Sequence, residues 1–321
     1  MSETTQARTH IDPPLRRLLD DMVGPDDATP PTELAERRAL ADATMMLIHP
    51  GALPGVVVQD HQVAVAGGEI RVRVSRPEAI AGPAPTLFFI HGGGWFQGNL
   101  DTGEVECGPM APAVPCAVVS VEYRLAPEHP FPTGLDDCVA AYEWLLANVE
   151  RLGVDPVRIA VGGTSAGGNL AAALCLVARD RGLPMPIAQV LDVPALDLTL
   201  SSPSMDSVGE DAGLVKAAVA EFVDLYAAGR TELTNPLVSP LFADLGGLPP
   251  AVVVVAEHDP VRDDGERYVQ RLHESGVAAF GIRVLAHFHG SWIIPITTTN
   301  RLLHDLRVAT LRRVFDGTLV P

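Results

Sequence analysis

Ser165 lies in the stretch GGTSAGGNLAAAL, residues 162–174, where glycines flank a single serine just before an apolar run. The segment Gly163 to Gly167 fits the pattern GxSxG and follows RIAVG, which predicts a strand. A serine on a sharp turn between strand and helix exposes its oxygen as a nucleophile, and small neighbours permit that turn. The stretch therefore indicates nucleophilic catalysis by Ser165. The alternative is a glycine-rich turn that merely begins a helix.

A second glycine cluster, HGGGW at 91–95, follows the predicted strand TLFFI at 86–90. Acyl transfer creates a tetrahedral oxyanion, and consecutive glycines let backbone N–H groups approach that charge without obstruction by side chains. The cluster also precedes GxSxG in the order typical of esterases. We expect His91 to fix this loop by hydrogen bonds rather than to act as a base.

The predicted acid follows the apolar run AVVVVA at 251–256, which is typical of a buried strand. In serine hydrolases with this nucleophile turn, the chain order is serine, then acid, then histidine. Asp259 is the first acid clear of the strand and is our candidate. Three further acids lie inside the start of the next helix, where they favour the helix dipole: Asp263, Asp264 and Glu266.

The predicted base follows the strand pattern AFGIRVLA at 279–286, which leads into His287 and His289. We select His289 because Gly290 opens the loop beside it, and we expect His287 to be a packed or hydrogen-bonded neighbour. The HxH pair could bind a metal, but the sequence offers no third cluster of ligands, so no metal or cofactor is expected. In this interpretation Asp259 orients His289, which takes the proton of Ser165 for attack on an ester carbonyl.

Short apolar runs alternating with helical patterns must position these residues, and they predict an α/β fold with a largely parallel sheet. The further strand runs are 116–121, 158–163 and 189–193, and the helical patterns are 134–150, 166–180 and 262–276, the last ending at Gly276. Other helical patterns, at 13–24, 31–47 and 210–229, could form a lid over one face of the sheet. We divide the chain into four parts. Residues 1–50 form an N-terminal helical cap segment, 51–200 the first part of the core, 201–235 a cap insertion and 236–321 the second part of the core.

Composition limits the partners and the location of the protein. The 321 residues carry a net charge of −17, which disfavours nucleic acid and anionic membranes as partners. The first residues lack the pattern of a secretory signal, and no apolar run approaches the length of a membrane span, so we expect a cytoplasmic protein. The cysteines form no CxxC pair and are expected to be reduced core residues: Cys107, Cys116, Cys138 and Cys175.

Taken together and in order, several motifs resemble those of the bacterial hormone-sensitive-lipase family of carboxylesterases. They are HGGGW, YRLAPEHPFP at 123–132, GTSAGGNLA at 163–171, LPPAVVVVAEHDPVRDDGE at 248–266 and the HG of 289–290. The form GTSAG resembles one branch of that family, with Thr164 where many members carry Asp. The chain departs from the family where Ser291 precedes Trp292, since an aromatic residue usually follows the histidine and glycine directly.

The resemblance implies an α/β-hydrolase fold, a mostly parallel central sheet flanked by helices, with a helical cap. It implies hydrolysis of short to medium acyl esters, small-molecule substrates and, by analogy, a homodimer. Carried over by motif, the resemblance implies that the catalytic residues are Ser165, Asp259 and His289. It implies an oxyanion hole formed by the amides of Gly93, Gly94 and Ala166. The structural scaffold would include Tyr123, Arg124 and Glu128.

Two other functions stay open at this point. The same fold could serve a catalytically silent receptor for small molecules, or an amidase or peptidase. Several side chains could line a substrate pocket or could equally be ordinary core: Met45, Met46, Phe222 and Tyr226.

Overall fold

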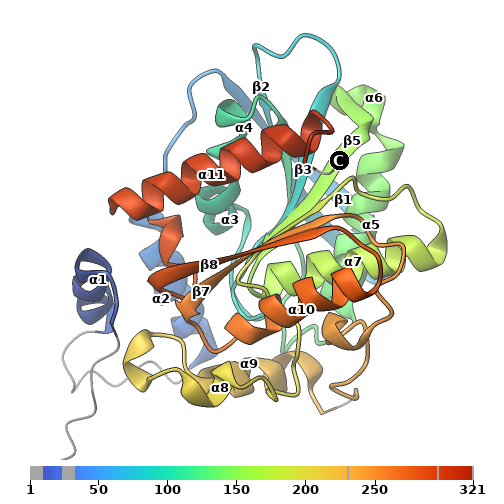
Figure 1. Ribbon diagram of the computed structural model, residues 1–321. Coiled ribbons are helices and arrows are strands. Elements are labelled where there is room, and N and C mark those ends of the chain that lie inside the picture. The colour runs from blue at the N-terminus through green and yellow to red at the C-terminus, as the bar shows by residue number, and fades with distance from the viewer. Residues whose placement is uncertain (1–9, 24–32, 230, 295, 320–321) are drawn as a thin grey trace, which may run out of the picture.

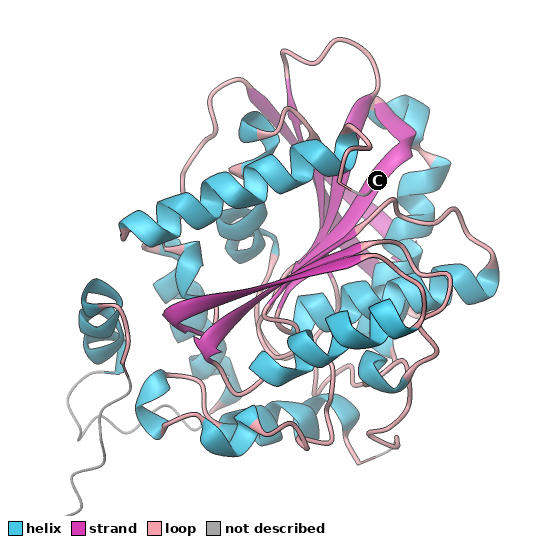
Figure 2. Cartoon of the chain, in the orientation of Figure 1, coloured by secondary structure: helices cyan, strands magenta, loops and turns pink. Residues whose placement is uncertain are grey.

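The computed structural model describes residues 10–23, 33–229, 231–294 and 296–319. In these ranges eight strands form one sheet in the order β1-β2-β4-β3-β5-β6-β7-β8 (Figures 1 and 2). The strands are β1 Val56–Val65, β2 Gly68–Pro77, β3 Ala84–Ile90, β4 Ala117–Glu122, β5 Val154–Thr164, β6 Gln189–Asp192, β7 Ala251–His258 and β8 Ala279–Phe288. Pairing is antiparallel from β1 through β2 to β4 and parallel across the rest of the sheet.

The apolar runs of the sequence correspond to the strands from β3 to β8, so the prediction of a largely parallel sheet is confirmed. Strands β1 and β2 were not predicted. They form an antiparallel hairpin at the edge of the sheet, and most residues of β1 are exposed or half-buried. Such a strand needs no continuous apolar run, which is why the pattern of buried strands missed it.

Helices cover both faces of the middle of the sheet, which explains why its central strands, such as β3, β4 and β7, are mainly apolar. On β3, Phe88 belongs to the core formed with α5 (Thr133–Ala147) and α7 (Ala166–Arg181). Phe89 instead packs with α4 (Met110–Ala113) and α11 (Thr298–Phe315) on the opposite face. Alternate residues of one strand thus enter two different cores. The remaining helices of the two layers are α3 Leu100–Cys107, α6 Val149–Leu152 and α10 Arg262–Glu274, with short 3₁₀ turns η2 Pro240–Phe242 and η3 Ser291–Ile293.

The other helices gather beyond the end of the sheet, in the lower left of Figure 1. They are α1 Pro13–Val23, α2 Leu34–Met46, α8 Ser204–Ser207 and α9 Lys216–Ala227. The continuous helix predicted over 210–229 was wrong. A 3₁₀ turn, η1 Glu210–Ala212, is separated from α9 by Gly213, whose φ of +89° ends helical geometry. Residues 24, 31 and 32 of the predicted N-terminal helices lie outside the described residues.

Two ion pairs connect the N-terminal helices to the later helical segment. Arg16 of α1 lies 3.1 Å from Asp211, and Arg37 of α2 pairs with Glu221 of α9. Segments about 190 residues apart in the chain therefore lie side by side. A cap built from two pieces of the chain requires such contacts. The residue boundaries of the cap segment and the cap insertion given above stay a prediction.

We expect Phe88→Ala to lower the free energy of unfolding by about 3–5 kcal/mol, because the ring is fully buried and its loss leaves a cavity between β3 and α5. Urea unfolding at neutral pH measures the effect. Val157→Ala on β5 is the matched control, since Val157 is 74% exposed and its truncation should change stability by less than about 0.5 kcal/mol. Equal effects of the two substitutions would contradict the proposed core.

Candidate active site

Ser165 occupies a strained turn between β5 and α7. Its φ of 57° and ψ of −118° are rare for a residue with a side chain and cost on the order of 1–3 kcal/mol. The turn is possible because a Cβ at Gly163 would lie 2.3 Å from the Gly167 carbonyl oxygen, and one at Gly167 would lie 2.0 Å from that of Ile90. Glycine is therefore required at both positions.

The three side chains selected from the sequence lie in one hydrogen-bonded chain. His289 Nε2 is 2.9 Å from Ser165 Oγ, and His289 Nδ1 is 2.8 Å from Asp259 Oδ2. Asp259 is completely buried, and its Oδ1 accepts the Val261 N–H at 3.0 Å. Because a carboxylate faces Nδ1, the proton of the neutral imidazole belongs there, which leaves Nε2 to accept the proton of the serine.

The histidines and acids that the sequence does not favour as base or acid make other contacts. His91 Nδ1 is 2.7 Å from the Gly92 carbonyl oxygen and its ring stacks on Tyr123, while His287 Nε2 is 2.8 Å from Asn300 Oδ1. The three further acids contact loop amides, a serine hydroxyl or arginines: Asp263, Asp264 and Glu266. In the described part of the chain, no three side chains form a group suited to a metal ion.

The glycine loop lies against Ser165. A Cβ at Gly92 would come within 3.6 Å of the Ser165 Cβ, and one at Gly93 would lie 2.2 Å from the Gln97 carbonyl oxygen. The φ angles of Gly93 and Gly94 are +111° and +57°. Among the described residues, none accepts a hydrogen bond from the N–H of Gly93, Gly94 or Ala166. The donor capacity of these three amides is thus unused within the described residues.

Aromatic side chains of α9 pack on this loop. The Tyr226 ring stacks on Trp95 at 4.6 Å and is buried, so it belongs to the core. Phe222 is half-buried, and a Cβ at Gly94 would lie 2.8 Å from its ring. Phe222 of α9 therefore packs against the backbone at Gly94. Of the other two residues considered for a pocket, Met45 is half-buried and Met46 is exposed.

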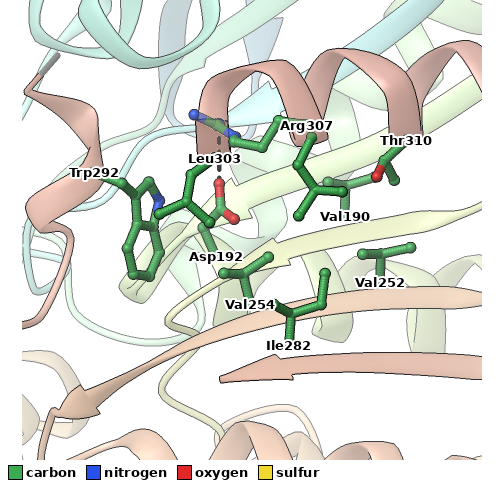
Figure 3. Close-up of a pocket in the computed structure, with 10 residues that line it drawn as sticks. Val190, Asp192, Val252, Val254, Ile282, Trp292, Leu303, Arg307 and Thr310 are labelled. Atoms are coloured by element: carbon green, nitrogen blue, oxygen red, sulfur yellow. Dashed lines mark ion pairs between the residues drawn. The ribbon is translucent and has the colours of Figure 1, made fainter. Parts of the chain in front are cut away.

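A buried charged cluster behind Ser165 is not predicted from the sequence. The backbone carbonyl of Asp192 accepts a hydrogen bond from the Ser165 N–H at 2.8 Å. The side-chain Oδ2 of Asp192 lies 2.9 Å from the Arg307 guanidinium of α11. Figure 3 shows this pair within a cavity lined mainly by aliphatic side chains, with Trp292 on one side of the pair and Val190 and Val252 on the other. The acid inside the apolar run QVLDV was the available signal.

Glu106 of α3 is the second buried carboxyl near this pair. Burial raises its pKa to about 7, while Thr164, Arg307 and His289 lower it and Asp192 raises it further. Its Oε2 and the Thr164 hydroxyl are both buried, and the two do not meet the geometry of a hydrogen bond. Arg307 thus pairs with Asp192 and also lies near enough to lower the pKa of Glu106.

This chain belongs to the alpha/beta hydrolase fold family whose model matches residues 87–293, and its mostly parallel sheet with flanking helices is that fold. It is a carboxylic ester hydrolase. It is 40% identical over 284 residues to carboxylesterase NlhH of Mycobacterium tuberculosis, covering 87% of this chain and 88% of that protein. Identity to an arylesterase of Saccharolobus solfataricus is 41%, covering 80% of this chain and 83% of the relative.

The solved structures agree with this assignment. The ester-hydrolase EH1AB1 from the metagenome of Lake Arreo is 36% identical and superposes with a TM-score of 0.90 over 95% of this chain and 99% of that one. The resemblance to bacterial hormone-sensitive-lipase carboxylesterases is thereby confirmed. Within the described ranges, no helix has the length and apolar character needed to cross a membrane.

The ionisation of Glu106 predicts a pH dependence of stability. Since its pKa is about 7 in the folded chain and 4.5 ordinarily, the folded state holds an extra proton between these values. Its stabilising contribution is complete below pH 4.5 and is lost as the pH rises through 7. Relative to wild type, Glu106→Gln should gain about 3 kcal/mol of unfolding free energy between pH 4.5 and pH 8.

Chemical unfolding of both proteins at several pH values measures this gain. Glu143→Gln, at an exposed position on α5, is the control and should follow the wild type throughout. Parallel stability curves for wild type and Glu106→Gln would show that Glu106 is ionised in the folded protein as readily as in the unfolded chain.

Proposed function

We propose that the protein is a serine carboxylesterase in which Ser165 is the nucleophile, His289 the general base and Asp259 the residue that orients the histidine. The observation that carries the proposal is the pair of hydrogen bonds from His289 Nδ1 to the Asp259 carboxylate and from the Ser165 hydroxyl to His289 Nε2, at 2.8 and 2.9 Å. Both lie in the range needed for proton transfer in a resting enzyme.

In the first half of the reaction, Ser165 Oγ attacks the ester carbonyl as its proton passes to His289 Nε2. The ionised Asp259 stabilises the imidazolium that forms. The carbonyl oxygen becomes an oxyanion, which receives the N–H groups of Gly93, Gly94 and Ala166. These amides are fixed by the backbone of the loop and of the start of α7, so they need little reorganisation during the step.

The tetrahedral intermediate collapses when His289 returns its proton to the departing alcohol, leaving an acyl group on Ser165. A water molecule then attacks this acyl-enzyme while His289 Nε2 takes its proton. The second intermediate releases the carboxylic acid, and the proton returns to Ser165. No step requires a cofactor.

For the substrate, we propose small-molecule esters with short to medium acyl chains. The half-buried Phe222 ring beside Gly94 supports this choice, because it places an apolar wall next to the oxyanion amides. Residues 1–50 and 201–235 are proposed as the cap that contributes this wall, which the ion pairs of Arg16 and Arg37 support.

Further expectations concern the surroundings of the protein. We propose a cytoplasmic location and, by analogy with the family, a homodimer. The net charge of −17 supports the absence of nucleic acid and anionic membranes among its partners.

Hydrolysis of a chromogenic short-chain ester tests the assignment. Ser165→Ala and His289→Ala should each lower kcat by about 10⁴-fold or more, since the groups act as one unit. His287→Gln should retain kcat within about tenfold, because its contacts are with Asn300 and the Leu285 carbonyl. Circular dichroism verifies that each variant is folded.

The same assay separates the alternative functions. A silent receptor would turn over no ester even as wild type, and an amidase would cleave the matched anilide faster than the ester. A greater loss of kcat in folded His287→Gln than in His289→Ala would refute the choice of base.

A further inference from the structure

Arg38 of α2 binds two separate loops of the core at once. Its Nε donates to the Phe96 carbonyl at 2.6 Å, and Nη2 donates to the Ala126 carbonyl at 2.8 Å. Nη1 and Nη2 also donate to the two carboxylate oxygens of Glu128, at 2.8 and 2.7 Å. The planar fork of a guanidinium suits this geometry, which a lysine could not reproduce.

The Phe96 carbonyl that Arg38 binds belongs to a turn that is hydrogen-bonded to the glycine loop. The Gly93 carbonyl accepts the N–H groups of Phe96 and Gln97, at 3.2 and 3.1 Å. That carbonyl and the Gly94 N–H belong to one planar peptide unit, so fixing the direction of the first fixes the direction of the second. A contact that holds Phe96 in place therefore orients the Gly94 amide.

The side chain of Phe96 is fixed as firmly as its backbone. The Arg37 guanidinium lies 5.1 Å from the centre of the Phe96 ring, and the Phe222 ring lies 4.9 Å away on α9. Phe96 is only 2% exposed. Two consecutive arginines of α2 thus contact its ring and its carbonyl oxygen.

The ion pair with Glu128 has a lesser part in this arrangement. Arg38 holds the pKa of Glu128 at about 2, so the pair stays charged at ordinary pH. Yet the Glu128 side chain is 54% exposed, and pairs so exposed contribute little to stability. The contacts with the two carbonyls distinguish Arg38 from a surface salt-bridge partner.

We propose that Arg38 is a positioning residue for the oxyanion hole, which it serves by holding the Phe96 turn so that the Gly93–Gly94 peptide presents its N–H beside Ser165. This inference rests on the proposed function. It assigns the N-terminal helix α2 a part in stabilising the transition state, separate from any contact with substrate.

Kinetics of Arg38→Ala test the inference. We expect kcat for the short-chain ester to fall about 10- to 100-fold with KM changed by less than about threefold, because a misdirected amide weakens transition-state binding alone. Affinity for a trifluoromethyl ketone, which forms an oxyanion on Ser165, should fall by the same factor as kcat/KM. Added guanidinium ion at sub-denaturing concentration should restore part of kcat in Arg38→Ala and none in His289→Ala.

Control variants separate positioning from folding. Arg313→Ala, at an exposed position on α11, should behave as wild type, and Glu128→Gln should lose less than about threefold in kcat. If Arg38→Ala does not fold, Arg38→Lys decides, since it retains a charge near Glu128 without bridging both carbonyls. It should show a reduced kcat with little change in KM.

Wild-type kcat in folded Arg38→Ala, or in Arg38→Lys where it is the deciding variant, would overturn the inference, as would a loss confined to KM. These results differ from failure of the proposed function, in which Ser165→Ala would itself retain activity.

Discussion

The close contact between the start of α7 and the end of β3 is the constraint on which the site depends. At Gly167 there is no room for a methyl group, since the Ile90 carbonyl oxygen would lie 2.0 Å from it. Ile90 is followed directly by the glycine loop, and Gly167 follows the nucleophile by two residues. This single contact therefore brings Ser165 and the amides of residues 93 and 94 to the same place. The unfavourable backbone angles of Ser165 persist because the surrounding packing allows no other path.

The residues that surround this contact divide into two groups by their chemistry. On one side, the partly exposed His289 and the buried Asp259 form a short hydrogen-bonded chain with Ser165 that is suited to moving a proton. On the buried side, Asp192, Glu106 and Arg307 form a cluster with more carboxyl groups than the guanidinium can neutralise. The turn at Ser165 thus lies between a polar, reactive environment and a buried one whose charge varies near neutral pH.

Sequence reasoning succeeded where the signal was local and failed where it was not. The strands from β3 to β8 and the turn at Ser165 were predictable because a buried strand or a glycine turn is encoded in a few consecutive residues. Asp259 and His289 followed from their positions after strands, and the structure brings both to Ser165, although this alone does not establish their roles. The hairpin β1–β2 was missed because its exposure removes the apolar run. The contacts of Arg38 and Arg307 could not be predicted, since their partners lie 58 to 115 residues away in the chain.

The order of the strands also determines when the chain becomes reactive. Ser165 follows β5, near the middle of the sequence, whereas His289 follows β8, at the far edge of the sheet and 124 residues later. During synthesis Ser165 leaves the ribosome long before His289, and domains generally fold as units. A nascent chain ending before β8 therefore carries Ser165 without His289. Any chemistry that needs both side chains becomes possible only when nearly the whole chain has been made.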